Sequence, residues 1–217
     1  MKRPIHRPFK VCVVILVTLA AAIRPVRAAR ACVEGESAGN VSAPMRIVNA
    51  ASEKDAISGA SGRGYLEIRQ GAGDPPEVEG RASVSFEIPE AGRYHLWCRV
   101  RWVDGCGNSL GMRVGDAPVF TFGQDGTYKR WHWVKAPGGL RQLDLAKGTH
   151  TLTILHREDG VALDQILFVT QDRYVPVGIE KTTPPSGGRT RNWSKGTPPA
   201  RVTDPRFYAS DDTTGGK

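Results

Sequence analysis

Short runs of alternating apolar and polar residues, separated by Gly, Pro, Asn or Asp, fill most of the chain between residues 32 and 176. Alternation with a period of two is the pattern of a strand with one buried face. No stretch there has the apolar spacing of a helix longer than a turn or two. We therefore predict an all-β domain, a β-sandwich of two antiparallel sheets. Its ten expected strands span residues 32–38, 45–49, 64–68, 82–88, 92–103, 109–114, 129–134, 140–145, 148–156 and 162–169.

The run over residues 92–103 separates the two faces of its sheet most clearly, because side chains alternate between the faces along a strand. One face is apolar and is expected in the core: Tyr94, Leu96, Cys98, Val100 and Trp102. The other face places an indole among ionisable side chains: His95, Trp97, Arg99 and Arg101. We expect this second face to bind a ligand, to pack against a second domain or to be solvated.

The last two expected strands are joined by Glu158-Asp159-Gly160, and an Asp-Gly turn between alternating runs predicts a hairpin. Asp164 lies inside the second run, where an unpaired charge would cost several kcal/mol. Glu34 and Glu36 lie on the first expected strand, and three carboxylates at one sheet end would suit a hard cation such as calcium. The alternative is that arginines neutralise them, and three are available: Arg69, Arg99 and Arg157.

Residues 1–31 have the composition of a secretory signal peptide. Four basic residues and no acidic one occur in the first ten, and the apolar run Val11–Ile23 follows. This run is too short to span a bilayer as a helix. Cleavage after Ala28 or Ala31 fits the small residues there, and lipidation of Cys32 or an uncleaved anchor are the alternatives. We expect a secreted, periplasmic or cell-envelope protein whose mature chain has no membrane span.

Removing the signal changes the charge of the protein. The full chain has a formal net charge of +8, and residues 1–31 contain seven basic and no acidic side chains, which leaves +1. The Pro-, Gly- and Thr-rich tail 177–217 has seven basic and four acidic residues, which leaves −2 on residues 32–176. A slightly acidic domain gives no support for a nucleic-acid partner. We expect the tail to be disordered.

Of the four cysteines, Cys12 would leave with the signal, and Cys32, Cys98 and Cys106 would remain in an oxidising compartment. We expect one disulfide and one buried thiol among these three, and the sequence does not choose the pair.

Carbohydrate recognition uses aromatic planes that stack on sugar C–H faces and planar polar groups that bind hydroxyls. Trp131 and Trp133 share one face of an expected strand, and Asn108 lies in the glycine-rich loop 104–109. With Trp97 and Arg99 they form the candidate ligand-binding set. The alternatives are that both Trp131 and Trp133 are core aromatics and that Asn108 only satisfies its own turn.

Three segments together resemble carbohydrate-binding modules of families 6 and 35, which are jelly-roll β-sandwiches of the galactose-binding type. They are Glu34-Gly35-Glu36, the run Ala91-Gly92-Arg93-Tyr94-His95-Leu96-Trp97, and Leu163-Asp164-Gln165-Ile166. The resemblance covers roughly residues 32–176 and implies a structural calcium held by Glu34, Glu36 and Asp164. In many related modules an Asn two residues before the last Asp contacts sugar, but this chain has Ala162 there. Either the sugar site differs, with the 104–109 loop as its centre, or sugar binding has been lost.

The expected function is therefore a secreted, non-catalytic carbohydrate-binding module that contains calcium and binds a polysaccharide or other glycan. The alternative is a structural or protein-binding sandwich of the cell envelope with an envelope protein as its partner and no sugar affinity. We do not expect an enzyme at this length and with this all-strand pattern, in which no glycine-rich loop opens a helix to cradle a phosphate. Glu158 and Asp159 are adjacent and would point to different sides of a bond rather than flank it.

Overall fold

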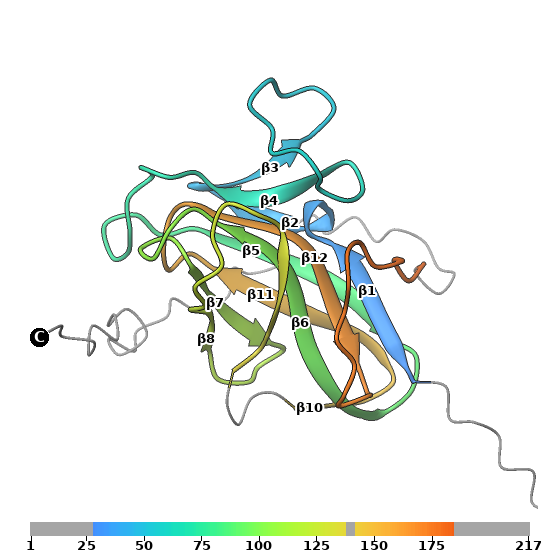
Figure 1. Cartoon of the computed structure of the whole chain (residues 1–217). Helices are drawn as coiled ribbons and strands as arrows, with labels where there is room; N and C mark the ends of the chain where they lie inside the picture. The colour runs from blue at the N-terminus through green and yellow to red at the C-terminus, as the bar shows by residue number, and fades with distance from the viewer. Residues whose placement is uncertain (1–27, 138–141, 185–217) are drawn as a thin grey trace, which may run out of the picture.

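The computed structural model describes residues 28–137 and 142–184 of the 217-residue chain (Figure 1). The described residues form strands joined by turns and loops, with one short 3₁₀ segment, η1. The elements are β1 (Arg30–Glu34), η1 (Gly35–Ser37), β2 (Gly39–Ser42), β3 (Met45–Asn49), β4 (Gly64–Ile68), β5 (Arg81–Ile88), β6 (Gly92–Trp102), β7 (Ser109–Val114), β8 (Phe120–Gly123), β9 (His132–Lys135), β10 (Leu143–Leu145), β11 (Gly148–Leu155) and β12 (Val161–Val169).

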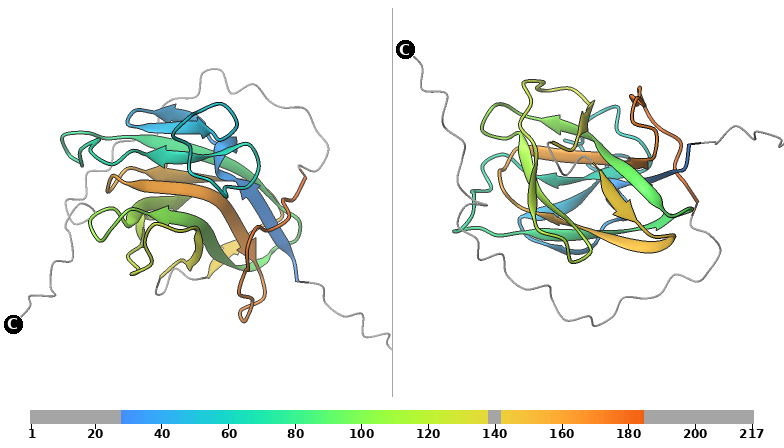
Figure 2. Two further views of the ribbon diagram at one scale, coloured as in Figure 1. Left: turned by 45° about the horizontal axis from the view of Figure 1, so that its top comes forward. Right: turned by 90° about the horizontal axis from the view of Figure 1, so that it is seen from below.

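These strands form two antiparallel sheets that face each other, as the views in Figures 1 and 2 show. The seven-stranded sheet has the order β10-β6-β12-β4-β3, with β1 beside β12 and β9 beside β6. The five-stranded sheet has the order β2-β5-β11-β7-β8. The predicted all-β sandwich is confirmed.

The centre of the seven-stranded sheet is β12, which is buried along its whole length. It pairs with β6 on one side; on the other side β1 pairs with residues 165–169 and β4 with residues 161–163. The pairing with β6 shifts register between Leu163 and Gln165, so Asp164 lies in a bulge. Bulges redirect side chains locally, which matters for the carboxylate described below.

The main core lies between the sheets and contains the predicted face of β6. All five of its predicted core residues are fully buried: Tyr94, Leu96, Cys98, Val100 and Trp102. They pack with inward-facing residues of the five-stranded sheet, among them Val84, Phe86, Met112 and Ile154. Burial of each large apolar side chain stabilises the fold by roughly 1.5–3 kcal/mol.

Three expectations about the strands are corrected. The segments β2 and β8 are strands that the sequence pattern missed, and both are edge strands of four residues. The strand expected from residue 129 begins at His132, because Lys129 has a φ of 58°, outside the extended region. The hairpin expected around Glu158-Asp159-Gly160 is wrong: β11 and β12 belong to different sheets, so this turn crosses the edge of the sandwich.

The predicted disulfide is also wrong, because Cys32, Cys98 and Cys106 are all free. Cys98 pairs with Ile166 of β12, and Cys32 pairs with Leu167, the next residue of that strand. Consecutive residues of a strand point to opposite faces of the sheet. Cys98 therefore enters the main core while Cys32 faces away from it, and Cys106 is exposed on a distant loop. Burial raises the pKa of the Cys32 thiol to about 12. Cys12 lies outside the described residues.

Contacts with the sandwich continue past residue 176, where the domain was expected to end. Thr183 donates its N–H to the Cys32 carbonyl at 2.8 Å, and the Glu180 carboxylate pairs with Arg30 at 2.9 Å. Residues up to 184 therefore belong to the folded domain, and the rest of the expected tail lies outside the described residues. Among the described residues, the structure has no helix long and apolar enough to cross a membrane.

Candidate functional site

The predicted site residues gather mostly on one surface, the side of the seven-stranded sheet that faces away from the five-stranded sheet. We call it the outer face. Two segments of the chain lie on it: residues 56–63, which we call the latch, and residues 171–184, which we call the strap. The chain's own loops thus pack on the outer face. Of the alternatives raised for the face of β6 that carries Trp97 and Arg99, this arrangement is nearest to packing against a second domain.

The three predicted metal-ligating carboxylates meet beneath the end of the latch. Ser61 donates its N–H to Asp164 Oδ1 at 2.7 Å and its hydroxyl to Glu34 Oε2 at 2.5 Å. The Arg63 N–H donates to Glu36 Oε1 at 2.7 Å. The structure therefore brings together residues from η1, from the strand before it and from β12, as the sequence indicated.

Two glycines make this approach possible. A Cβ at Gly35 would lie 2.2 Å from the Leu163 carbonyl oxygen, so η1 can run this close to β12 only without a side chain there. Gly62 has a φ of 56°, and a Cβ on it would lie 2.1 Å from Glu36 Oε1. A side chain at either position would push the carboxylates apart.

Charge compensation at the cluster is incomplete among the described residues. The Arg99 guanidinium pairs with Asp164 Oδ2, and both side chains are buried. Burial, together with the charges of the other two carboxylates, raises the pKa of Glu34. Glu36 Oε2 is buried without a hydrogen-bond partner. Three carboxylates and one guanidinium give the cluster a formal charge of −2. Asp164 is buried, whereas Glu34 and Glu36 are half-buried, so solvent offsets part of this charge.

The donor set fits a calcium ion in its chemistry, since it consists of carboxylate oxygens with a net charge opposite to that of the ion. Its present spacing does not: over residues 28–137 and 142–184, no group of three or more His, Cys, Asp or Glu side chains is arranged as metal ligands. Both alternatives from the sequence thus meet here. Arg99 pairs with Asp164, whereas Glu34 and Glu36 form no ion pair within the described part of the chain.

The latch is fastened to the outer face by side chains that point up from the sheet. The Tyr65 hydroxyl accepts the Ile57 N–H at 2.8 Å, and the Trp131 indole N–H donates to the Ser58 carbonyl at 2.9 Å. Arg99 donates from both terminal nitrogens to the Gly59 carbonyl, at 3.1 and 3.2 Å. Its guanidinium also lies 5.4 Å from the centroid of the Trp131 ring, a cation–π contact.

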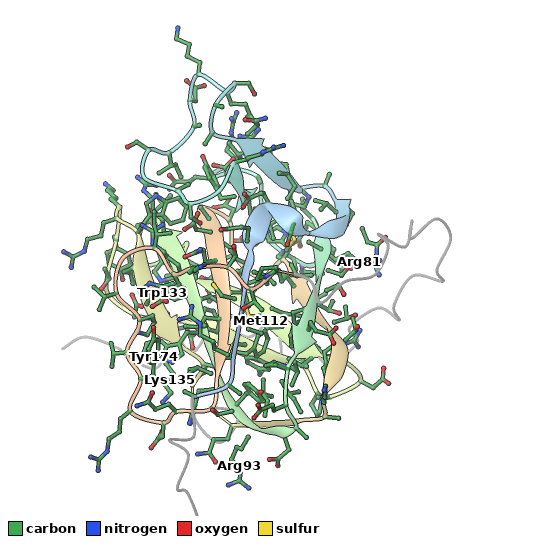
Figure 3. The ribbon with its side chains drawn as sticks, turned by 90° about the vertical axis from the view of Figure 1, so that its right-hand side faces the viewer. Arg81, Arg93, Met112, Trp133, Lys135 and Tyr174 are labelled. Carbon is green, nitrogen blue, oxygen red and sulfur yellow. The ribbon has the colours of Figure 1, made fainter. Side chains whose placement is uncertain are left out.

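The strap is held in the same manner on the neighbouring strands, and Figure 3 shows Trp133 and Lys135 near Tyr174 of the strap. The Trp133 indole N–H donates to the Gly178 carbonyl at 2.8 Å. The Gln165 amide exchanges two hydrogen bonds with the backbone of Glu180, at 2.8 and 2.9 Å. Lys135 bonds to Asp172 and lies over the Trp97 ring.

The five predicted ligand-binding residues therefore fall into three places. Trp131 and Arg99 lie under the latch, while Trp133 and Trp97 lie under or beside the strap. Asn108 lies at another part of the sandwich, where its N–H donates to Glu158 and its side-chain amide contacts the Asp125 carbonyl at 3.4 Å. Trp131 and Trp133 are half-buried, so their burial is intermediate between that of a core aromatic and that of an exposed platform for a sugar.

Sequence reasoning missed Tyr65 and Gln165 as residues of the outer face. Tyr65 meets Trp131 edge-on with ring centroids 5.4 Å apart. Both residues lie within correctly predicted strands. Alternation along β4 could have placed Tyr65 on this face, whereas the bulge at Asp164 breaks the alternation between Leu163 and Gln165. No local signal announces the loop and the strap that they hold.

The comparisons with known proteins bear on the fold. No family model matches the chain, and no curated protein matches it at a significant level. Among solved structures it is similar to the GH26-CBM35 β-(1,4)-mannanase of Podospora anserina, with a TM-score of 0.50, 17% identity, and coverage of 68% of this chain and 29% of that one. A family 35 carbohydrate-binding module from Clostridium thermocellum aligns over 64% of this chain and 96% of its own length, with 15% identity and a TM-score of 0.46.

The chain spans under a third of the length of the mannanase, and at this level of identity the likeness is one of fold. The β-sandwich fold implied by the resemblance noted in the sequence is thus shared with a mannanase whose name includes a family 35 carbohydrate-binding module. The chain has the β-sandwich fold found among proteins that contain carbohydrate-binding modules.

Proposed function

We propose that this chain is a non-catalytic carbohydrate-binding module that holds a structural calcium ion and binds polysaccharide through aromatic side chains of its outer face. The observation that carries the proposal is the grouping of Tyr65, Trp97, Trp131 and Trp133 on one face of a sandwich of this fold. The latch and the strap use the indole N–H groups of Trp131 and Trp133 and leave part of each ring at the surface, where it can contact a ligand.

Sugar stacking is the role that fits the indoles best. Trp131 and Trp133 each keep part of the ring at the surface while the N–H is used by the chain. Stacking on pyranose C–H groups uses the ring face and does not need the indole N–H. Arg99 would then act by positioning Trp131, and Asn108 would belong to a separate part of the ligand surface or to its own loop.

A calcium ion at Glu34, Glu36 and Asp164 is supported by the formal charge of −2 on the cluster and by the buried, unpartnered Glu36 Oε2. These three side chains would hold the ion, and its charge would offset the excess that the cluster carries. Carboxylate oxygens have more than one lone pair, so the bonds from Ser61 and Arg63 can persist beside an ion.

Binding without catalysis is supported by the hydrogen bonds of Glu158 and Asp159, the adjacent acids in the turn between β11 and β12. The N–H groups of Gly71 and Gly73 donate to Asp159, at 2.8 and 3.1 Å, and the Asn108 N–H donates to Glu158 at 2.9 Å. These carboxylates hold loops together, which is a structural role.

Export to the cell envelope or the medium is part of the proposal and rests on the composition of residues 1–31. Cleavage after Ala28 would retain Arg30, which pairs with Val169 in the sheet and with Glu180 in the strap. Cleavage after Ala31 would remove both contacts, so we favour the earlier position.

The test is retention of recombinant residues 29–184 on a panel of plant, algal and bacterial polysaccharides, with calcium and with a chelator. Retention on one class of polysaccharide is expected, together with its loss in Trp131→Ala at an unchanged thermal transition. Lack of retention on every polysaccharide, with a folded protein, would refute sugar binding. A melting temperature that is insensitive to chelator would refute the calcium ion.

A second candidate function is docking of an envelope protein, and a different surface favours it. Val175, Val177 and Ile179 are 66%, 81% and 56% exposed and alternate along the strap, so they form an apolar stripe. Capture of one stoichiometric envelope protein, lost when Val177 is changed to Ser and insensitive to added polysaccharide, would support this function over sugar binding.

A further inference from the structure

The latch closes a small apolar cluster that is separate from the main core. Val48, Tyr65 and Ala162 point to the outer face, yet they are 0%, 0% and 2% exposed. The side chains that cover them include those of the latch: Ala56, Ile57 and Ala60, with Trp131 at the side. The outer-face positions of β3, β4 and β12 are thus kept dry by a loop and not by a second sheet.

Most residues of the latch from Ile57 to Ser61 are held by hydrogen bonds to side chains beneath them. Ile57, Ser58 and Gly59 are bound by Tyr65, Trp131 and Arg99, and Ser61 is bound by Glu34 and Asp164. These five side chains come from β1, β4, β6, β12 and the residue before β9. Small satellite clusters under loops open at lower free energy than a main core, because they bury fewer apolar contacts.

We propose that the latch is a cover over an aromatic ligand site formed by Trp131 and Tyr65, and that a ligand reaches the ring face of Trp131 only when residues 57–60 move away. The inference rests on the proposed sugar-binding function and assigns the surface that would receive the sugar. It also explains why Arg99 lies over the indole: in the closed state the guanidinium occupies a ring face on which a pyranose would stack.

Closure would lower the apparent affinity for the ligand by the fraction of molecules that are open. Removal of a latch fastening should therefore raise the affinity, which is opposite to the effect expected of a residue that contacts the sugar. A hydrogen bond of ordinary net strength shifts the ratio of open to closed molecules about 5-fold, and two shift it about 25-fold.

The experiment compares the wild-type domain with Tyr65→Phe/Ser61→Ala, which removes two side-chain fastenings and keeps the Tyr ring. Hydrogen exchange of the amides of residues 57–61 reports opening. Acrylamide quenching, taken as the difference from the matching Trp131→Phe protein, reports access to Trp131. We expect exchange about 25-fold faster and stronger quenching of Trp131. The polysaccharide retained in the panel should bind more tightly by up to the same factor.

The matched control is Tyr94→Phe/Ser42→Ala, which removes two hydroxyl groups away from the latch: Tyr94 donates to the Glu90 carbonyl, and Ser42 accepts the Arg81 N–H. It should change neither readout. Faster exchange without stronger quenching of Trp131 would refute the proposal that the latch covers Trp131. Faster exchange together with weaker sugar binding would also refute it. If no polysaccharide binds either protein, the proposed function fails, whereas the exchange and quenching results still decide whether the latch covers Trp131.

Discussion

Replacement of Arg99 by Met tests the charge argument for the carboxylate cluster directly. Asp164 is 0% exposed and Arg99 is 8% exposed, so solvent screens their interaction little. Met keeps most of the length of the side chain and leaves Asp164 buried without its cation. Loss of one partner of a buried pair costs about 3–5 kcal/mol. For a domain of this size that corresponds to a fall in melting temperature of roughly 6–20 °C.

The assay is urea unfolding at pH 7, followed by circular dichroism, for wild type, Arg99→Met, Asp164→Asn and the double variant, each with chelator and with calcium. We expect the double variant to recover much of the stability lost in Arg99→Met, because the uncompensated carboxylate is then gone. Arg99 also binds Gly59 and Trp131, and the double-mutant cycle separates those contacts from the ion pair. Calcium should stabilise Arg99→Met more than wild type, since the excess negative charge rises from two to three.

A loss below about 1 kcal/mol in Arg99→Met with chelator would refute the claim that Asp164 depends on this partner. An equal calcium response in wild type and Arg99→Met would refute the claim that cluster charge governs cation binding. Neither result depends on the identity of a sugar.

Three further predictions concern single groups. Burial lowers the pKa of His156; the unfolded chain then binds the proton more readily, so stability should fall as the pH drops below about 6.5, and His156→Gln should flatten this slope in a pH series of melts. Burial raises the pKa of Glu34. Without calcium, the contribution of Glu34 to stability is therefore complete at pH values below its ordinary pKa and is lost as the pH rises through its pKa in the folded protein. Glu34→Gln should remove this loss of stability, and an unchanged pH profile of the melting temperature would contradict the prediction. In the native protein a thiol reagent should label Cys106 alone, with Cys32 and Cys98 reacting only in denaturant; rapid native labelling of two or three thiols would show that the buried pair is accessible.

Much of the fold could be predicted because strand alternation is a local property. The face of β6 that enters the core was correct at every position, since each side chain's direction follows from its place in the strand. The same alternation failed where the backbone leaves the extended region, as at Lys129, and it could not tell that β11 and β12 lie in different sheets. A turn sequence specifies a local reversal of the chain, whereas the sheet that each strand joins depends on pairing partners far away.

The candidate site divides in the same way. That Glu34, Glu36 and Asp164 belong together was expected from the charge that Asp164 places inside a strand and from the resemblance to family 6 and 35 modules. That Arg99 compensates Asp164 alone, that the latch covers Trp131 and Tyr65, and that the strap extends the domain past residue 176 were decided by tertiary structure. The sequence by itself determined which residues alternate, which face is apolar and where charge must be offset, because those properties reside in single residues and near neighbours. Which loop lies on which face is set by contacts between segments as much as 151 residues apart, such as Cys32 with Thr183, and no local pattern encodes them.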